Sequence, residues 1–326
     1  MSNKALIEKL EERIKDIHET ALEYKAANQV PSVSDSEMTY GYGEKKTGKL
    51  IETCVLYVDV RDSVKLVEKH QYNTMGKVYS AFTEAILRAT KHHGGSVRNI
   101  IGDRVMVVFP EENCFTNAVD CAISINHSSS LINKEFSGVK YKAGIGIDYG
   151  KMRVLKVGLK QQGAENYDNK NLVWVGSPAN IASRLTDVAG KSFYSSNKFK
   201  ITIPNQSKSS AFWNNEITDL FEIIDGTHSA VQPVEYFLTG SEILRKSKLN
   251  SEFQLEFMGK IIQSIIKDNE SYDIPKILAS ELVYEGLKNE NPNHGTFDGD
   301  YWEEVKYPFK NVKMKVFGME ATWKLN

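Results

Sequence analysis

Two strand-like runs separated by only two residues constrain the fold of this chain more than any other local feature. SVRNII (96–101) and RVMVVF (104–109) flank Gly102-Asp103, and glycine at the first position of a two-residue connection is typical of a tight β-hairpin. The preceding run ETCVLYVDV (52–60) predicts a buried strand, because it is apolar and rich in β-branched residues. The three runs together favour a mostly antiparallel sheet.

Helical patterns alternate with the predicted strands. The longest pattern, at 72–92, places on one face the side chains Met75, Val78, Tyr79, Phe82 and Ile86. Further helices are predicted at 61–69, 112–134 and 178–188, the last with Pro178 in its first turn. Further strands are predicted at 140–149, 152–157 and 172–175, with a polar loop over 158–171. This order of elements predicts an α+β fold in which helices pack against the sheet.

The two ends of the chain carry weaker signals. The first 24 residues repeat apolar side chains at heptad-like spacing, at Ile7, Leu10, Ile14, Ile17, Ala21 and Tyr24. This pattern predicts a helix that packs on its own domain or pairs with a second subunit. Beyond about residue 204 we expect strands at 218–224 and 233–238, helices near 250–268 and 274–289, and an edge strand at 310–318.

These signals predict three parts. Residues 1–50 would be an N-terminal helix and a polar linker, 51–240 a catalytic domain, and 241–326 a C-terminal extension of unassigned role. The chain has 41 Lys and Arg against 42 Asp and Glu, so a net charge of −1 argues against a protein that neutralises nucleic acid. No apolar run is long enough to span a membrane, the first residues show no export signal, and three cysteines make no disulfide framework. A cytoplasmic protein is expected.

Four polar side chains are candidates for chemistry. Asp59 ends a predicted buried strand and Asp103 lies in the hairpin turn. Carboxylates held at strand ends of one sheet can share divalent cations, although a helix cap and an ordinary turn residue are the alternatives. Asn180 and Arg184 are four residues apart and therefore project from one face of a predicted helix. They could hold a sugar and a phosphate, or they could simply face solvent.

Together these residues resemble the motifs of class III nucleotide cyclases, in the same order and over roughly residues 50–203. The matching segments are Tyr57-Val58-Asp59, Ile101-Gly102-Asp103 and the run from Val175 to Leu185. The resemblance implies a catalytic domain with a ferredoxin-like antiparallel sheet and helices packed against it, flanked by an N-terminal helix and a C-terminal α/β extension.

The resemblance also implies roles for these residues. Two Mn²⁺ or Mg²⁺ ions would be held by Asp59, Asp103 and the carbonyl of Val60, and a 3′-oxygen would displace pyrophosphate from the α-phosphate. Arg184 would neutralise the charge that builds on the phosphates, and Asn180 would orient the ribose. In this family the carboxylates and the Asn/Arg helix come from different subunits, which implies a homodimer with composite active sites.

The sequence departs from purine-specific members of the family. Their two base selectors fall at Asn99 and Val173, where neither usual residue is present, and Val173 cannot hydrogen-bond a base. Tyr57 replaces the usual phenylalanine, and Arg104 follows the second aspartate. A smaller pocket with added polar groups suits a pyrimidine, although Tyr57 could satisfy its hydroxyl inside the domain while Arg104 faces solvent.

These departures resemble the pyrimidine cyclases of bacterial anti-phage defence, the Pycsar systems. That resemblance implies UTP, or less favourably CTP, as the substrate, and a cyclic nucleotide that acts on a separate effector protein. Tyr57, Asn99 and Arg104 would contact the substrate. Two alternatives remain open at this stage: a purine cyclase with unusual selectors, and a catalytically silent cyclase-fold module that only binds nucleotide.

Overall fold

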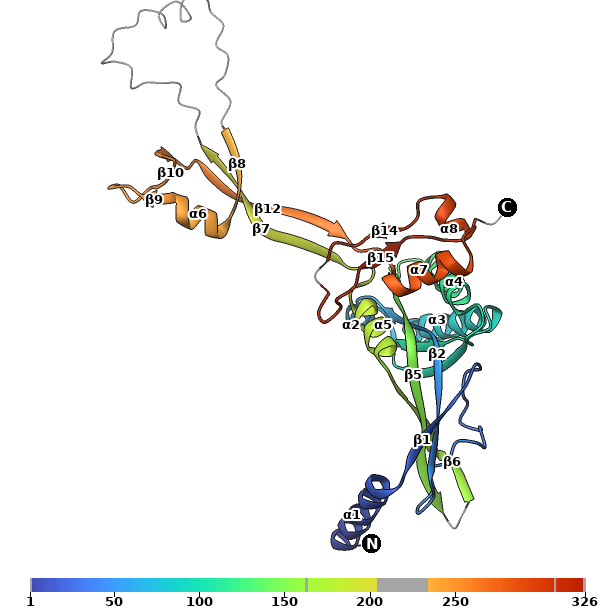
Figure 1. Ribbon diagram of the computed structural model, residues 1–326. Coiled ribbons are helices and arrows are strands. Elements are labelled where there is room, and N and C mark those ends of the chain that lie inside the picture. The colour runs from blue at the N-terminus through green and yellow to red at the C-terminus, as the bar shows by residue number, and fades with distance from the viewer. Residues whose placement is uncertain (1, 162–163, 204–233, 308, 325–326) are drawn as a thin grey trace, which may run out of the picture. The chain divides into compact units, whose positions relative to one another are not determined.

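The computed structural model describes residues 2–161, 164–203, 234–307 and 309–324. The chain forms two compact units, one made of Met1–Lys191 and Ile274–Asn326 and the other of Ser192–Asp273 (Figure 1). Every residue with a predicted chemical role belongs to the first unit. The strand predicted at 218–224 lies outside the described residues.

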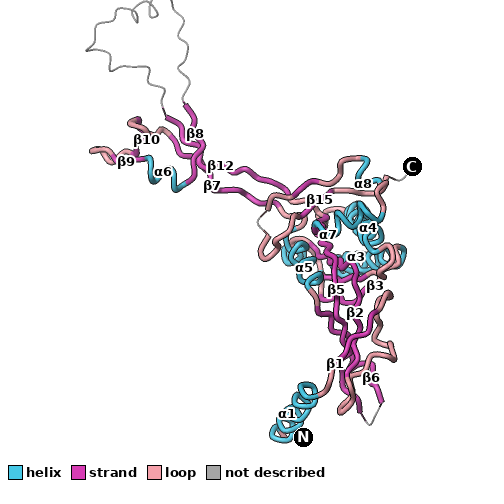
Figure 2. Tube along the Cα trace, in the orientation of Figure 1, coloured by secondary structure: helices cyan, strands magenta, loops and turns pink. Residues whose placement is uncertain are grey.

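A mixed sheet forms the centre of the first unit. In the described part of the chain it has nine strands: the order is β14-β15-β13-β5-β2-β4-β3, while β1 and β6 pair with the long strands β2 and β5. Figure 2 shows β2 and β5 side by side. The strands are β1 (Leu22–Ala26), β2 (Lys46–Val60), β3 (Ser96–Ile101), β4 (Arg104–Val108), β5 (Ala143–Gln161), β6 (Ala164–Val175), β13 (Ile277–Ser280), β14 (Glu303–Glu304) and β15 (Val316–Met319). The neighbours from β5 to β3 are antiparallel, whereas β13 runs parallel to β5.

Four central strands and two helices have ferredoxin-like connectivity. Along the chain β2 is followed by α3 (Tyr72–His92), β3, β4, α4 (Cys114–Glu135) and β5, with only the short α2 (Ser63–Lys69) added. In the sheet β5 lies beside β2, and then come β4 and β3. The predicted α+β fold with a ferredoxin-like antiparallel core is confirmed.

Alternation along β2 separates two hydrophobic cores. Leu56 and Val58 belong to the larger core, which includes buried residues of α3 and α4. The predicted apolar face of α3 lies there, with Tyr79 partly buried and the other four side chains buried. Val55 belongs to the second core, together with Ala179 and Ala182 of α5 (Ser177–Val188). Because successive side chains of a strand point to opposite faces, Tyr57 and Asp59 share the face that α5 covers.

The predicted hairpin is also confirmed. Ile101 of β3 pairs with Arg104 of β4, so Gly102 and Asp103 alone form the turn. Gly102 has a φ of +60°, a conformation that glycine adopts without steric cost. Since Arg104 pairs in turn with Asp59, the turn places Asp103 near the end of β2.

The N-terminal part is more structured than its sequence indicates. Helix α1 (Asn3–Glu19) ends before Ala21 and Tyr24, and that segment forms β1 because β2 offers a parallel partner for it. No residue of α1 is buried, so its apolar seam does not pack on its own domain in this structure. The predicted linker is wrong in part, because β2 begins at Lys46 and the side chains of Met38 and Tyr40 are buried. The predicted loop at 158–171 is largely the paired ends of β5 and β6, since a two-stranded extension can remain polar.

The C-terminal predictions need larger corrections. The region 274–289 is not one helix but the buried strand β13 followed by α7 (Glu281–Glu290). The strand predicted at 310–318 is shorter, and it lies between β13 and β14 rather than at an edge. The short helix α8 (Gly295–Asp298) precedes β14. A four-residue strand buried on all sides shows no periodicity, so the sequence carries little sign of it.

The second unit is small and mostly β-structure. It contains β7 (Ser192–Ile203), β8 (Val234–Thr239), α6 (Gly240–Lys246), β9 (Ser247–Leu249), β10 (Leu255–Phe257), β11 (Lys260–Ile261) and β12 (Ser264–Asp273). β7 lies between β12 and β8, and β10 between β11 and β9. The helix predicted at 250–268 is therefore wrong, whereas β8 confirms the strand predicted from 233. None of the described helices combines the length and apolar character that crossing a membrane requires.

Candidate active site

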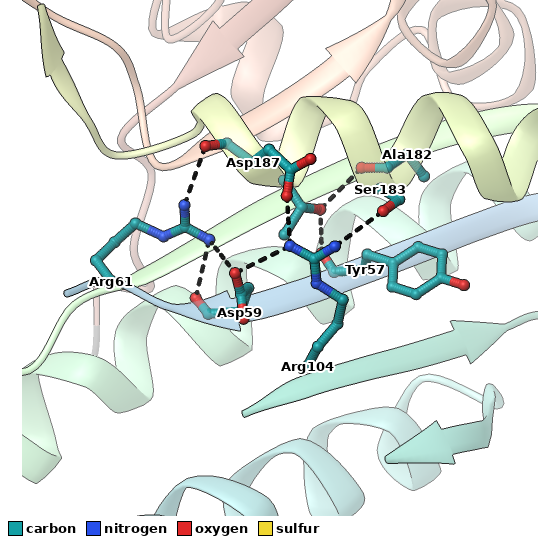
Figure 3. A network of polar contacts seen from close by, with 8 residues as sticks. Tyr57, Asp59, Arg61, Arg104, Ala182, Ser183 and Asp187 are labelled. Carbon is teal, nitrogen blue, oxygen red and sulfur yellow. Dashed lines mark hydrogen bonds and ion pairs between the residues drawn. The ribbon is translucent and has the colours of Figure 1, made fainter. Parts of the chain in front are cut away.

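Asp59 is the centre of a polar network on the α5 face of the sheet (Figure 3). Its Oδ2 accepts a hydrogen bond of 2.9 Å from Nη2 of Arg61 and another of 3.1 Å from Nη2 of Arg104. Arg61 is 5% exposed and also donates from Nη1 to the main-chain carbonyl of Asp187, at 3.3 Å. Burial lowers the pKa of Arg61, while the neighbouring Asp59 raises it. Two guanidinium groups therefore contact the carboxylate of Asp59.

Arg104 reaches across from β4 to helix α5. Its Nη1 donates a 3.0 Å hydrogen bond to Oγ of Ser183, and its Nη2 forms an ion pair with the carboxylate of Asp187. Burial opposes the charge of Arg104, but hydrogen bonds to Asp187 and Asp59 raise its pKa. The alternative in which Arg104 points freely to solvent is therefore wrong, because this side chain joins the end of β2 to the helix.

Two glycines of β5 allow α5 to lie this close to the sheet. Gly146 pairs with Tyr57, and Gly144 pairs with Asp59. A Cβ at Gly146 would lie 2.3 Å from the carbonyl oxygen of Ala182, and one at Gly144 would lie 2.7 Å from Nε of Arg61. Thr186 then donates from Oγ1 to the carbonyl of Tyr57 at 3.1 Å, which joins helix and strand. Only glycine leaves room for this approach.

The predicted metal ligands occupy the ends of β2 and the hairpin. Asp103 is half-buried, and in the described part of the chain it makes no hydrogen bond or ion pair. Burial raises the pKa of Tyr79 on α3, and the carboxylates of Asp103 and Asp59 both add to this shift, so both lie near that phenol. The side chain of Val60 is buried in the larger core and has no ligand atom, so only its main-chain carbonyl is a possible ligand.

This donor set fits a hard divalent cation. Mg²⁺ and Mn²⁺ favour carboxylate and carbonyl oxygens, and an unpaired, half-buried carboxylate gains from a nearby cation. The described residues contain no cluster of three or more His, Cys, Asp or Glu side chains suited to a metal. Two carboxylates and a carbonyl would therefore leave several coordination positions for water or for substrate phosphates.

Two of the residues predicted to contact the base, Tyr57 and Asn99, lie on the same face of the sheet, in the row of paired residues next to that of Asp59. Tyr57 pairs with Met106, and Met106 pairs with Asn99. Residues directly opposite each other on neighbouring strands point to the same face, so Tyr57 and Asn99 both belong to the α5 side. Burial raises the pKa of Tyr57, so its phenol stays neutral and can donate a hydrogen bond. Asn99 is exposed.

Asn180 and Arg184 do not meet the carboxylates of their own chain. Asn180 is exposed, and Nη1 of Arg184 donates to the carbonyl of Asn311 at 3.4 Å. Ser183 and Asp187 occupy the adjacent face of α5 and contact Arg104 instead. Among the described residues, no hydrogen bond or ion pair joins Asn180 or Arg184 to Asp59 or Asp103. The structure thus separates the two halves of the predicted constellation.

Sequence reasoning did not identify Arg61, Ser183, Asp187, or the glycines of β5. The alternation Gly-Ile-Gly-Ile at 144–147 is a usable signal, because glycine inside a strand marks close approach of another backbone. Arg61 lies 126 residues from its partner Asp187, and nothing in the local sequence links the two.

Comparisons with known proteins give relatives but no family model that matches the chain. It is 27% identical over 175 residues to the uridylate cyclase of Burkholderia cepacia, covering 52% of this chain and 72% of that protein. It is 28% identical over 183 residues to the uridylate cyclase of Xanthomonas perforans, covering 54% and 74%. With the uridylate cyclase of Rhodovulum sp. (strain MB263) the identity is 26% over 174 residues, covering 50% and 67%.

Solved structures with similarity to this chain include nucleotide cyclases. The adenylyl cyclase CyaB from P. aeruginosa is 12% identical with a TM-score of 0.46, over 83% of this chain and 95% of that one. The guanylyl cyclase Cya2 is 20% identical with a TM-score of 0.38, over 43% and 71%. The ordered motifs, the ferredoxin-like core and the sequence relatives agree, and together they support a nucleotidyl cyclase of class III.

Proposed function

We propose that this chain converts a pyrimidine nucleoside triphosphate, UTP in preference to CTP, into the 3′,5′-cyclic nucleotide and pyrophosphate. The observation that carries the proposal is the set of groups on the α5 face. There the bonded Asp59, the neutral Tyr57 phenol and the Arg104 guanidinium lie in two neighbouring rows of the sheet, and Asp103, which has no hydrogen bond or ion pair among the described residues, lies in the turn next to Arg104. Triphosphate, metal and base would need groups of these kinds.

The choice of a pyrimidine is supported by the base side of the site. Tyr57 and Arg104 add bulk and hydrogen-bonding groups, which suits a small base with polar edges. Uracil presents two carbonyl acceptors, and a guanidinium has only donors. Four relatives carry the name uridylate cyclase, which favours UTP over CTP.

Asp59, Asp103 and the carbonyl of Val60 would hold two Mn²⁺ or Mg²⁺ ions. When bound, such cations lower the pKa of a ribose 3′-hydroxyl and neutralise the triphosphate. Asn180 of the partner subunit would orient the ribose, and Arg184 of the partner subunit would balance the charge on the phosphates. Tyr57 and Asn99 would contact the base, and Arg104 would do so once it is released from Asp59.

The reaction forms one bond and breaks one bond. The ribose 3′-oxygen bonds to the α-phosphorus, and the bond from that phosphorus to the bridging oxygen of the β-phosphate breaks. Pyrophosphate carries away the bonding electron pair, and the 3′-hydroxyl proton passes to solvent. The protein contributes orientation and charge compensation rather than a covalent intermediate.

The active form would be a head-to-tail homodimer. Asn180 is exposed and Arg184 is half-buried, and among the described residues neither bonds to the carboxylates of its own chain. Two chains related by two-fold symmetry would form two sites, each with carboxylates from one chain and Asn/Arg from the other. We further propose that the product is a second messenger of bacterial anti-phage defence and acts on a separate effector protein.

A four-nucleotide assay tests this function. Purified protein with Mn²⁺ is incubated separately with UTP, CTP, ATP and GTP, and products are identified by liquid chromatography and mass spectrometry. We expect cyclic UMP and pyrophosphate, with loss of nearly all turnover in Asp59→Asn and Asp103→Asn. Asp62→Asn is the matched control, because Asp62 is exposed, forms an ion pair only with Lys65 in the part of the chain that the structure describes, and has a φ of +53° that asparagine tolerates.

Each possible result decides a separate part of the proposal. Inert protein with all four triphosphates would contradict the cyclase activity. Preference for a purine would contradict the assignment of Tyr57 and Arg104 to a pyrimidine site. Full turnover in either aspartate variant would contradict the assignment of the two cations.

A further inference from the structure

Arg104 has more partners than a residue that only contacts a base would need. Its Nη2 is shared between the carboxylates of Asp59 and Asp187, at 3.1 Å from Asp59, while its Nη1 bonds to Ser183. The exposed fraction of the Arg104 side chain is 31%, and that of the Asp59 side chain is 17%. The pair with Asp59 is therefore partly shielded from water and stronger than a pair on an open surface, whereas the Asp187 side chain is 54% exposed.

The contact with Asp59 conflicts with the proposed role of that carboxylate. A divalent cation and a guanidinium on the same carboxylate repel each other. Arg61 can remain, because it is buried and is also held by the carbonyl of Asp187. Arg104 is the more exposed of the two, and it already has a second anionic partner on α5.

We infer that Asp187 is a positioning residue that retains Arg104 on helix α5 when a cation takes Asp59. In the structure Arg104 bridges Asp59 and Asp187. When the cation binds, the bond to Asp59 breaks, while Asp187 and Ser183 keep the guanidinium beside the row that contains Tyr57. Arg104 is then both free of the metal carboxylate and fixed at the base side. This inference rests on the proposed function, because it requires Asp59 to bind a cation.

The same contact connects the two active sites of the proposed dimer. Asp59 serves the site to which its own chain supplies the carboxylates, whereas α5 carries Asn180 and Arg184 for the other site. Ser183 and Asp187 lie on α5 within one turn of Arg184, so Arg104 joins the two half-sites inside each chain. Cation binding at one site therefore changes a contact of the helix that serves the second site.

Mn²⁺ binding without nucleotide tests the inference independently of turnover. Free Mn²⁺ is measured by electron paramagnetic resonance in the wild type, Asp187→Asn, Arg104→Gln and the double variant. Without Asp187 a displaced Arg104 would lose both anionic partners, so we expect Asp187→Asn to weaken binding roughly three- to tenfold. Arg104→Gln removes the competing cation and should tighten binding.

The double variant separates positioning from simple charge. If Asp187 acts through Arg104, the double variant should bind Mn²⁺ as Arg104→Gln does. If Asp187 merely adds negative charge near the cation, it should weaken binding equally in both backgrounds, and that result would overturn the inference. Unchanged binding in Asp187→Asn would overturn it as well. Asp62→Asn is again the matched loss of a carboxylate and should leave binding unchanged.

Two further measurements keep the failure of each proposal distinct. Far-UV circular dichroism and thermal unfolding establish that each variant is folded. Asp59→Asn must abolish the Mn²⁺ site of the wild type. If the wild type shows no Asp59-dependent binding, the two-cation function fails and this inference fails with it. If that binding is present but the Asp187 and Arg104 effects are additive, only the inference fails.

Discussion

Replacement of Gly146 by alanine should disturb the candidate site without changing any polar group. The added Cβ would lie 2.3 Å from the carbonyl oxygen of Ala182 and 2.5 Å from the main-chain nitrogen of Thr186. Both atoms belong to the backbone of α5, so no side-chain rotation can relieve the contact. The helix must move away from β5 by about 1 Å to restore an ordinary van der Waals distance.

Two effects set the expected loss of stability in Gly146→Ala: overpacking and a weakened hydrogen bond. Overpacking of this kind costs about 1–3 kcal/mol. Weakening the 3.1 Å hydrogen bond from Thr186 to the Tyr57 carbonyl adds about 1 kcal/mol. A total of about 2–4 kcal/mol corresponds to a drop in Tm of roughly 5–15 °C for a unit of this size. Because α5 also carries Asn180 and Arg184, a shift of about 1 Å should lower kcat by about 100-fold.

The assay compares thermal unfolding and UTP turnover of Gly146→Ala with those of Gly76→Ala. Gly76 lies in α3, where an added Cβ would meet no atom within 4 Å, so alanine there should leave activity unchanged and raise Tm slightly. Turnover is measured well below the Tm of Gly146→Ala, so that unfolding does not account for the loss. Wild-type Tm and turnover in Gly146→Ala would refute the close packing of α5 on β5.

Two further predictions concern assembly and pH. Mixing equal amounts of Asp59→Asn and Arg184→Ala chains should restore about a quarter of wild-type turnover, because half of the dimers are mixed and each has one intact site; no recovery after subunit exchange would contradict composite sites. Burial raises the pKa of Asp148 to about 6 from its ordinary value of 3.8. The folded state therefore favours the protonated carboxyl, and the stability that this form contributes is lost as pH rises through about 4 to 6. Asp148→Asn should therefore stabilise the protein at pH 7.5 by up to about 3 kcal/mol, with the gain vanishing below about pH 4 in urea unfolding experiments; an equal effect at both pH values would contradict this.

The part of the site that sequence predicts best is the part with strong local patterns. The buried run ending at Asp59 and the two-residue turn at Gly102-Asp103 each specify their element, and the sheet then brings these elements together. The alternation of apolar side chains along β2 also determines that Tyr57 and Asp59 share a face. The fold class and the relative position of these residues can therefore be predicted from the sequence alone.

The contacts of Arg104 cannot be predicted from the sequence in this way. The same guanidinium could face solvent, a base or a carboxylate, and only the position of α5 decides between them. That position depends on Gly144 and Gly146 of a different strand. The C-terminal elements cannot be predicted from the sequence for a similar reason. β13 has only four residues, and it forms a strand because it pairs with the edge of β5.

The C-terminal segment also helps to hold the candidate site. β13 pairs with Ile145, Gly146 and Ile147 of β5. This part of β5 includes one of the two glycines against which α5 packs and is adjacent to the other, Gly144. The main-chain nitrogen of Ile145 donates to the carbonyl of Lys276, and that of Gly190, just after α5, donates to the carbonyl of Pro275. Residues 275–279 thus fix both the strand beneath the helix and the turn that follows it. Although the sequence assigns no role to this segment, it belongs to the scaffold that positions Asp59, Arg104 and α5.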